Sequence, residues 1–346
     1  MKEENCGKRG WEEIFCQTCI WSERYEIKEI LGVGGTGKVY LAWDIRLERF
    51  VAIKILEQVT EQFKEEIEVL KRQALWMLPA VYDAWVEENK TGVIVMEYVE
   101  GKNLKEYLTL HRQISERQIY EWGLQLGAFL IKLHSENPQI LYRDLKMENI
   151  IVQPDKTLRL VDVGAAVRLG TEGVCRHKRV GTFGYAAPEQ WDGREVDERA
   201  DIYGLGAVLY AVTAGEEKLR NLVVSKNIVE HEAGPVGMMQ VIRRCLQREP
   251  EKRYTTAEAF LEEWKRYKRE GRLQGFLRQA ESVLRYGFLY AAVYVVWYRQ
   301  EFLSLVWNFL AGYFLLKTAE YIYRKRNEKW EQKKSVWCRG TGYDTV

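Results

Sequence analysis

A glycine cluster between two strand-like segments constrains the fold of this chain more than any other feature. Gly32, Gly34 and Gly37 have the spacing G-x-G-x-x-G, with Gly35 inside it. In dinucleotide-binding folds this spacing leads from a strand into a helix, whereas here residues 38–43, K-V-Y-L-A-W, read as a second strand. The cluster therefore predicts a β-hairpin, which is either an ordinary glycine turn or a flexible cover for phosphate groups.

Lys54 ends an otherwise apolar strand-like run, V-A-I-K, and is costly to bury without an acidic or phosphate partner. The following helix, expected over residues 61–73, has an apolar stripe at helical spacing. At about 100° per residue, Glu66 lies beside that stripe, whereas Glu65 and Glu68 fall on the opposite side. We therefore expect Glu66 to turn inward and pair with Lys54.

Acidic and amide side chains follow in the middle of the chain. Residues 142–149 read Y-R-D-L-K-M-E-N, and a D-V-G sequence begins at Asp162. Phosphoryl transfer needs a carboxylate to accept the proton of the attacking hydroxyl and oxygen ligands for Mg²⁺. Asp144 fits the first role, while Asn149 and Asp162 fit the second. Lys146 can neutralise the transferring phosphate.

These motifs, in this order, resemble the eukaryotic-type protein kinases, in particular the Ser/Thr kinases found in bacteria. The resemblance covers about residues 22–268 and includes A-P-E at residues 187–189. It places Arg253 opposite Glu189, and it gives Asp201 the role of bracing the catalytic loop. The resemblance implies an α+β fold with two lobes, a small antiparallel β lobe with one helix and a larger, mainly helical lobe.

The expected organisation has four parts. They are a cysteine-bearing segment at 1–20, a kinase domain at 21–268 with an N-lobe at 21–99 and a C-lobe at 100–268, an apolar helical hairpin at 276–323, and a basic tail at 324–346.

The resemblance also assigns the site residues. Asp144, Lys146, Lys54 and Glu66 are the expected catalytic residues, and Asn149 and Asp162 are the expected Mg²⁺ ligands. The backbone of residues 97–99 is expected to bind adenine, beside a gatekeeper at Met96. The expected ATP contacts are Gly32, Val33, Gly34, Gly35, Gly37, Val39, Ala52, Lys54, Glu97, Val99, Asn149 and Asp162.

The assignment to Ser/Thr kinases depends on Lys146 and Thr182, because tyrosine kinases resemble R-D-L-A-A-R-N at the catalytic loop. Two positions depart from the family pattern: Tyr142 replaces the usual His, and Val163 replaces the usual Phe. The smaller Val163 weakens the apolar stack that links the lobes. The alternative function is a pseudokinase, an ATP-binding scaffold that acts through protein contacts.

A regulatory site is expected at Thr171. In the resemblance Thr182 contacts the catalytic loop, which leaves Thr171 as the candidate for phosphorylation in the activation segment. Its phosphate could pair with Arg143 and with Arg168 or Arg176. In the alternative interpretation, a partner protein orders this loop and Thr171 is merely exposed.

Three cysteines near the start, Cys6, Cys16 and Cys19, are arranged like the two knuckles of a zinc ribbon. Glu3 stands where the fourth cysteine is expected. Three thiolates and one further ligand could hold Zn²⁺ in tetrahedral geometry. The alternative is a degenerate ribbon or unrelated free thiols.

Two apolar runs lie near the end, at residues 286–298 and 302–316. Each is shorter than the roughly 20 residues of a transmembrane helix, and basic residues flank the outer ends of both. This pattern favours a membrane-inserted hairpin with both ends in the cytoplasm. The alternative is a buried helical pair that serves packing or self-association.

Charge separates the chain into two regions. Residues 261–346 contain 16 basic and 9 acidic residues, a net charge of +7, which leaves a net charge of −5 for residues 1–260. An acidic body argues against nucleic-acid binding, and a basic, apolar tail points to an anionic membrane surface. The start has no apolar run and the 6 cysteines are few, so we expect a cytoplasmic kinase domain anchored at the cell membrane, with ATP and protein substrates as partners.

Overall fold

The structure is a computed structural model. It describes residues 20–21, 23–34, 37–57, 59, 61–71, 75–87, 91–111, 113–169, 181–225, 236–297 and 303–340. The chain divides into two compact units, Met1–Lys265 and Arg266–Val346.

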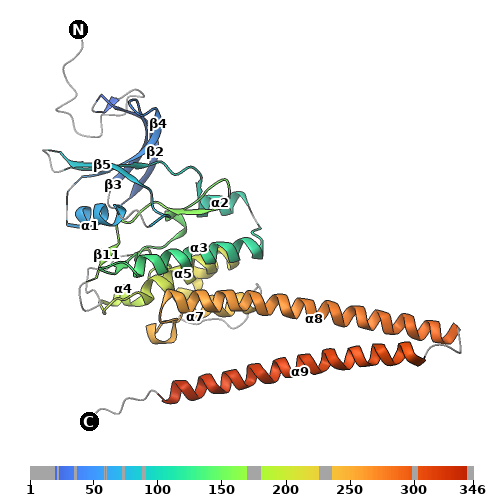
Figure 1. Ribbon diagram of the computed structural model, residues 1–346. Helices are drawn as coiled ribbons and strands as arrows, with labels where there is room; N and C mark the ends of the chain where they lie inside the picture. Colours follow the sequence, from blue (N-terminus) through green and yellow to red (C-terminus); the bar gives the residue numbers. More distant parts are fainter. Residues whose placement is uncertain are drawn as a thin grey trace, which may run out of the picture. The chain divides into compact units, whose positions relative to one another are not determined.

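The first unit begins with an antiparallel sheet of six strands in the order β1-β2-β3-β4-β6-β5 (Figure 1). The strands are β1 (Ile20–Trp21), β2 (Tyr25–Gly34), β3 (Gly37–Asp44), β4 (Arg49–Leu56), β5 (Val81–Val86) and β6 (Gly92–Glu97). Gly32 and Gly34 lie at the end of β2, Gly37 begins β3, and Gly34 pairs with Gly37. The predicted hairpin is therefore confirmed, and no helix follows the glycines.

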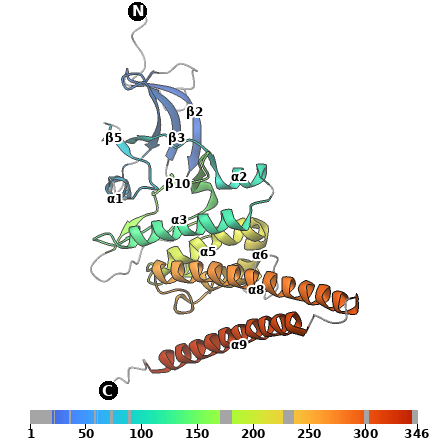
Figure 2. The same cartoon turned by 45° about the vertical axis from the view of Figure 1, so that its right-hand side comes forward.

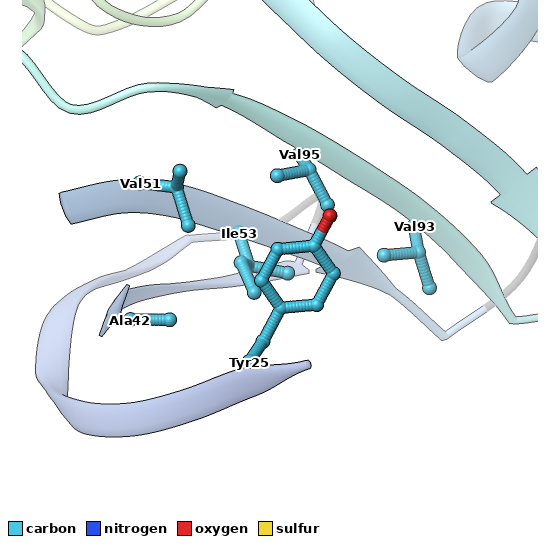
Figure 3. Packing of buried hydrophobic residues seen from close by; sticks show 6 residues of the cluster. All are labelled: Tyr25, Ala42, Val51, Ile53, Val93 and Val95. Carbon is cyan, nitrogen blue, oxygen red and sulfur yellow. The ribbon is translucent and has the colours of Figure 1, made fainter. Parts of the chain in front are cut away.

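One face of this sheet carries a small apolar core (Figure 3). Its fully buried members are Tyr25, Ala42, Val51, Ile53, Val93 and Val95, with the ring of Tyr25 reaching from β2 toward β4 and β6. Side chains alternate between the two faces of a strand. Because Val51 and Ile53 occupy the core face of β4, Ala52 and Lys54 point to the other face, where α1 (Glu61–Leu70) supplies Glu66.

The rest of the first unit is mainly helical. Its elements are β7 (Lys102–Asn103), α2 (Leu104–Leu110), α3 (Glu116–His134), β8 (Ile140–Leu141), η2 (Met147–Asn149), β9 (Ile150–Val152), β10 (Leu158–Leu160), β11 (Val167–Arg168), α4 (Pro188–Asp192), α5 (Arg199–Ala214), α6 (Glu216–Ser225), α7 (Val236–Cys245), η3 (Pro250–Lys252) and the start of α8 (Ala257–Trp297). Helix α5 is buried over most of its length and packs against α3, α6 and α7 (Figures 1 and 2). The short strands β8 and β9 precede and follow the segment 142–149, which contains Asp144. A β-sheet lobe followed by a helical lobe matches the two-lobed prediction.

The second unit contains the rest of α8 and α9 (Leu303–Gly340). The two helices pack together, since Gly287 faces the ring of Phe309 and Lys317 reaches Glu281 at 3.6 Å. Many aromatic and aliphatic side chains of both helices are exposed. Helix α9 continues through residues 324–340, so the boundary expected at residue 324 falls inside a helix.

Within the described ranges, no helix has both the length and the apolar character needed to cross a bilayer. The transmembrane helix expected from the sequence is thus not found there, because charged residues such as Glu281, Arg285 and Lys317 lie directly beside the apolar stretches of α8 and α9 and keep them short.

Candidate active site

Lys54 lies at the centre of a cluster of three charged side chains. Its Nζ donates to Glu66 Oε1 at 2.6 Å and to Asp162 Oδ1 at 3.0 Å, and the Lys54 and Glu66 side chains are both nearly inaccessible. The expected ion pair between Lys54 and Glu66 is therefore present. The N–H of Gly164 also donates to Asp162 Oδ1, at 2.9 Å, which fixes the orientation of that carboxylate.

The charges in this cluster depend on one another. Burial alone would lower the pKa of Lys54, but the negative charges of Glu66 and Asp162 outweigh it and raise the pKa. Burial raises the pKa of Glu66, although Lys54 opposes that rise. Burial would also raise the pKa of Asp162, but Lys54 and the N–H of Gly164 hold it below its ordinary value. Lys54 thus stays cationic and Asp162 anionic near neutral pH.

The glycine hairpin lies on the strands that carry Lys54. Val39 of β3 pairs with both Gly32 of β2 and Lys54 of β4. Gly37 has a φ of 150°, and a Cβ there would collide with the carbonyl of Ile55. Glycine is therefore required at this position if β3 is to approach β4 this closely.

The remaining expected ATP contacts lie close to these strands. Ala52 pairs with Met96 across β4 and β6, and Ala52, Met96 and Val99 are buried, whereas Val33 is exposed. Gly35 lies outside the described residues.

Asp144 lies at a second cluster, where three side chains converge on its carboxylate. Lys146 Nζ donates to Oδ2 at 2.6 Å, Thr182 Oγ1 donates to Oδ1 at 2.8 Å, and Asn149 Nδ2 donates to Oδ2 at 3.2 Å. Lys146 Nζ also donates to Thr182 Oγ1 at 3.0 Å. Thr182 is 38 residues from Asp144, so the fold brings together the residues that the sequence analysis assigned to one site.

Asp201 holds the backbone just before Asp144. Its carboxylate accepts from the N–H of Tyr142 at 2.8 Å and from the N–H of Arg143 at 2.7 Å. His134 Nε2 lies 2.8 Å from the same carboxylate. Sequence reasoning found Asp201 but missed His134, because a lone histidine at the end of an apolar helix gives no signal of a partner 67 residues away.

Arg143 has a φ of 65°, which is unusual for a residue other than glycine. Asp201 holds its N–H, and Gln190 Nε2 donates to its carbonyl at 2.8 Å. Two buried polar side chains thus maintain a strained backbone immediately before Asp144. Gln190 was also missed, since only the preceding A-P-E sequence was informative.

Glu189 and Arg253 form a fully buried pair, as expected. The distances are 2.5 Å from Nη1 to Oε1 and 2.8 Å from Nη2 to Oε2. Arg253 also donates to the carbonyls of Gln247, Arg248 and Arg199. The pair therefore joins α4 to the turns that precede α8.

Tyr142 and Val163, the two departures from the family pattern, lie next to Asp162. The hydroxyl of Tyr142 donates to the carbonyl of Asp162 at 2.5 Å, and Val163 is buried. Tyr142 thus connects the segment 142–149 directly to Asp162, the expected metal ligand.

Several predicted sites lie outside the described residues: Thr171, Arg176, Cys6, Cys16 and Cys19. Arg143, the expected partner of a phosphate on Thr171, donates through Nε to the carbonyl of Ala165 at 2.7 Å. In the part of the chain that is described, no group of three or more acidic, histidine or cysteine side chains could hold a metal ion.

The two lobes, the buried lysine–glutamate pair and the converging side chains at Asp144 define the architecture of a protein kinase. The family model described as the protein kinase domain matches residues 25–265. The chain belongs to the protein kinase family.

Its curated relatives include bacterial serine/threonine-protein kinases. A probable serine/threonine-protein kinase of Clostridium acetobutylicum is 33% identical over 265 residues, which cover 70% of this chain and 40% of the relative. The serine/threonine-protein kinase PknB of Mycobacterium leprae is 32% identical over 260 residues, which cover 68% of this chain and 42% of the relative. The chain therefore spans about two fifths of the length of the curated relatives it matches.

Proposed function

We propose that this chain is a serine/threonine protein kinase, which transfers the γ-phosphoryl group of ATP to a hydroxyl of a protein substrate. The observation that carries the proposal is the position of Asp144, whose carboxylate accepts hydrogen bonds from Lys146 and Thr182. A scaffold that acts only through protein contacts needs neither this arrangement nor the buried pair of Lys54 and Glu66.

Each residue has a role that follows from its chemistry. Asp144 orients the substrate hydroxyl and accepts its proton, and Lys146 neutralises charge on the transferring group. Lys54, held by Glu66, positions the phosphates of ATP, and the glycine hairpin covers them.

Carboxylate and amide oxygens are ligands that Mg²⁺ prefers, so Asp162 and Asn149 fit a magnesium site. The bound ion would neutralise the phosphate charge. Lys54 and Gly164 hold the Asp162 carboxylate in a fixed orientation for this purpose.

The test is transfer of labelled phosphate from ATP to a generic basic protein by the full-length chain, with Asp144→Asn as the control. Asp144→Asn keeps the size of the side chain but removes its ability to accept the proton. We expect transfer by the wild type and none by the variant. Nucleotide binding without transfer by the wild type would instead favour the pseudokinase alternative.

We also propose that the unit Arg266–Val346 holds the kinase at the cytoplasmic face of a membrane. The supporting observation is the exposure of large side chains on α8 and α9, including Tyr286, Tyr290, Trp307 and Phe314, at 71%, 76%, 69% and 76%. Removing such a surface from water is favourable, and the excess of basic residues in this region suits an anionic lipid surface.

A further inference from the structure

Arg159, on β10, makes an unusual set of contacts for a residue outside the charge clusters. Its guanidinium binds the carboxylate of Glu97 through two bonds, Nη2 to Oε2 at 2.6 Å and Nη1 to Oε1 at 3.1 Å. Bidentate pairs of this kind are both strong and geometrically specific. The Arg159 side chain is 16% exposed and that of Glu97 is 31% exposed, so the pair is half-buried and solvent screens it in part.

The same guanidinium also holds the turn between α1 and β5. Arg159 Nη2 donates to the carbonyl of Leu78 at 3.0 Å, and Nε donates to the carbonyl of Met77 at 3.3 Å. The N–H of Leu160, the next residue, donates to Met77 at 2.9 Å. On the other side of the pair, the N–H of Ala80 donates to Glu97 Oε2 at 3.2 Å. We call Arg159, Glu97 and the turn 77–80 the Arg159 clamp.

The Arg159 clamp connects three parts of the chain that lie next to expected site residues. Glu97 ends β6 and begins the segment whose backbone is expected to bind adenine. The turn 77–80 lies between α1, which carries Glu66, and β5. Strand β10 ends at Leu160, two residues before Asp162. The Arg159 side chain thus contacts Glu97 and the turn 77–80. It does so from β10, the strand that leads to Asp162.

We propose that Arg159 is a positioning residue for ATP and for the Lys54–Glu66 pair. By fixing Glu97 and the turn 77–80 on β10, it sets the distance between the adenine-binding backbone and Asp162. The role of Arg159 rests on the proposed kinase function, because Arg159 positions the residues expected to bind ATP.

A purely structural role makes a different prediction. If the clamp only stabilises the fold, its removal lowers the free energy of unfolding but leaves the nucleotide affinity of the folded protein unchanged. Arg24 offers a control, because it also binds a carboxylate through two hydrogen bonds, from Nε to Asp44 Oδ1 at 3.1 Å and from Nη2 to Asp44 Oδ2 at 2.8 Å. Asp44 is the last residue of β3, where it pairs with Tyr25 of β2 and Arg49 of β4. Arg49 is the first residue of β4, whereas Lys54 lies near the other end of that strand.

The experiment compares Arg159→Met, Arg159→Lys and Arg24→Met in the full-length chain. Affinity for MgADP is measured by calorimetry, KM for ATP and kcat by phosphate transfer, and the fold by thermal unfolding. We expect Arg159→Met to weaken MgADP binding and to lower kcat/KM on the order of tenfold. Arg159→Lys keeps the charge but not the fork, so we expect an intermediate effect. Arg24→Met should lower the Tm and leave both nucleotide parameters at the wild-type value.

Amide hydrogen exchange supplies a second measurement. Loss of the clamp should accelerate exchange in α1 and in the turn 77–80 of Arg159→Met, but not of Arg24→Met. Wild-type nucleotide affinity and wild-type exchange in α1 for Arg159→Met would overturn the proposal. If the wild type binds MgADP but transfers no phosphate, the proposed function fails, while the affinity and exchange measurements still test the clamp.

Discussion

The response of the site to loss of Lys54 depends on whether its partner Glu66 can take up a proton. Glu66 is nearly inaccessible and its pKa is already raised by burial. When Lys54 is removed, Glu66 can therefore take up a proton and avoid an uncompensated buried charge.

We accordingly predict that Lys54→Met, Asp144→Asn and Asp162→Ala each lower phosphate transfer by at least about 100-fold while the chain stays folded. Each variant removes a different contribution: phosphate positioning, proton acceptance or metal binding. Transfer assays with circular dichroism of each variant check this expectation. Wild-type rates in all three variants would contradict the assignment of the site.

The carboxylate of Asp44 leads to a prediction about how the stability of the fold depends on pH. Burial would raise the pKa of this carboxyl, but hydrogen bonds from Arg24 and from the N–H groups of Leu47 and Arg46 hold it below the ordinary value of 3.8. A carboxylate with a lowered pKa in the folded state stabilises the fold above the unfolded pKa, and this contribution is lost as pH falls through the folded pKa.

We therefore expect Asp44→Asn to lower the free energy of unfolding most at pH 7. Its difference from the wild type should shrink once the pH falls below about 4. Urea denaturation at several pH values between about 2 and 7 measures this difference. A gap between the two proteins that does not change with pH would show that the Asp44 charge is unimportant.

At the scale of elements, the pair of Glu189 and Arg253 connects segments that are far apart in sequence. Both side chains are almost completely buried, at 2% and 0% exposure. Removing one partner leaves the other as a buried charge without compensation, which typically costs about 3–5 kcal/mol.

We expect Arg253→Met to destabilise the kinase domain by about 3 kcal/mol or more, whereas Arg194→Met should change stability by less than about 1 kcal/mol. Arg194 is the matched control because it pairs with Asp192 at 2.9 Å on the surface, where both side chains are about half exposed. Equilibrium unfolding in urea measures both variants. Similar losses for the two would show that burial of the Glu189 pair contributes little.

At the scale of the whole molecule, the two units have different surfaces. The unit Met1–Lys265 buries most of its large apolar side chains, many of them in a sheet core and around α5, whereas α8 and α9 expose many of theirs in the unit Arg266–Val346. Large exposed apolar surfaces are typical of interaction sites, which supports the proposal that this unit binds a membrane.

We predict that the full-length chain remains with membranes after a high-salt or carbonate wash, and that deletion after residue 272 releases it while kinase activity persists. Salt removes attachment by charge alone but not insertion of aromatic side chains into lipid. Fractionation of both proteins followed by immunoblotting checks the outcome. Recovery of the full-length chain in the soluble fraction as a discrete oligomer would instead indicate that α8 and α9 pair with a second copy.

The sequence alone determined the features that depend on local chemistry. A strand after the glycine cluster predicted the hairpin, and helical geometry selected Glu66 rather than its neighbours as the partner of Lys54. Periodicity and motif spacing suffice for such features because the interacting residues lie within one or two adjacent elements.

Only the tertiary structure decided the contacts that hold those elements in place. His134 reaches Asp201 across 67 residues, and Arg159 reaches Glu97 across 62 residues. Neither histidine nor arginine stands out in the sequence, because its partner is set by how α3, α5, β6 and β10 pack and not by any local pattern. Polar side chains brought together in this way must pair to offset their burial. These pairs hold the backbone before Asp144 and the Glu97 side chain in place.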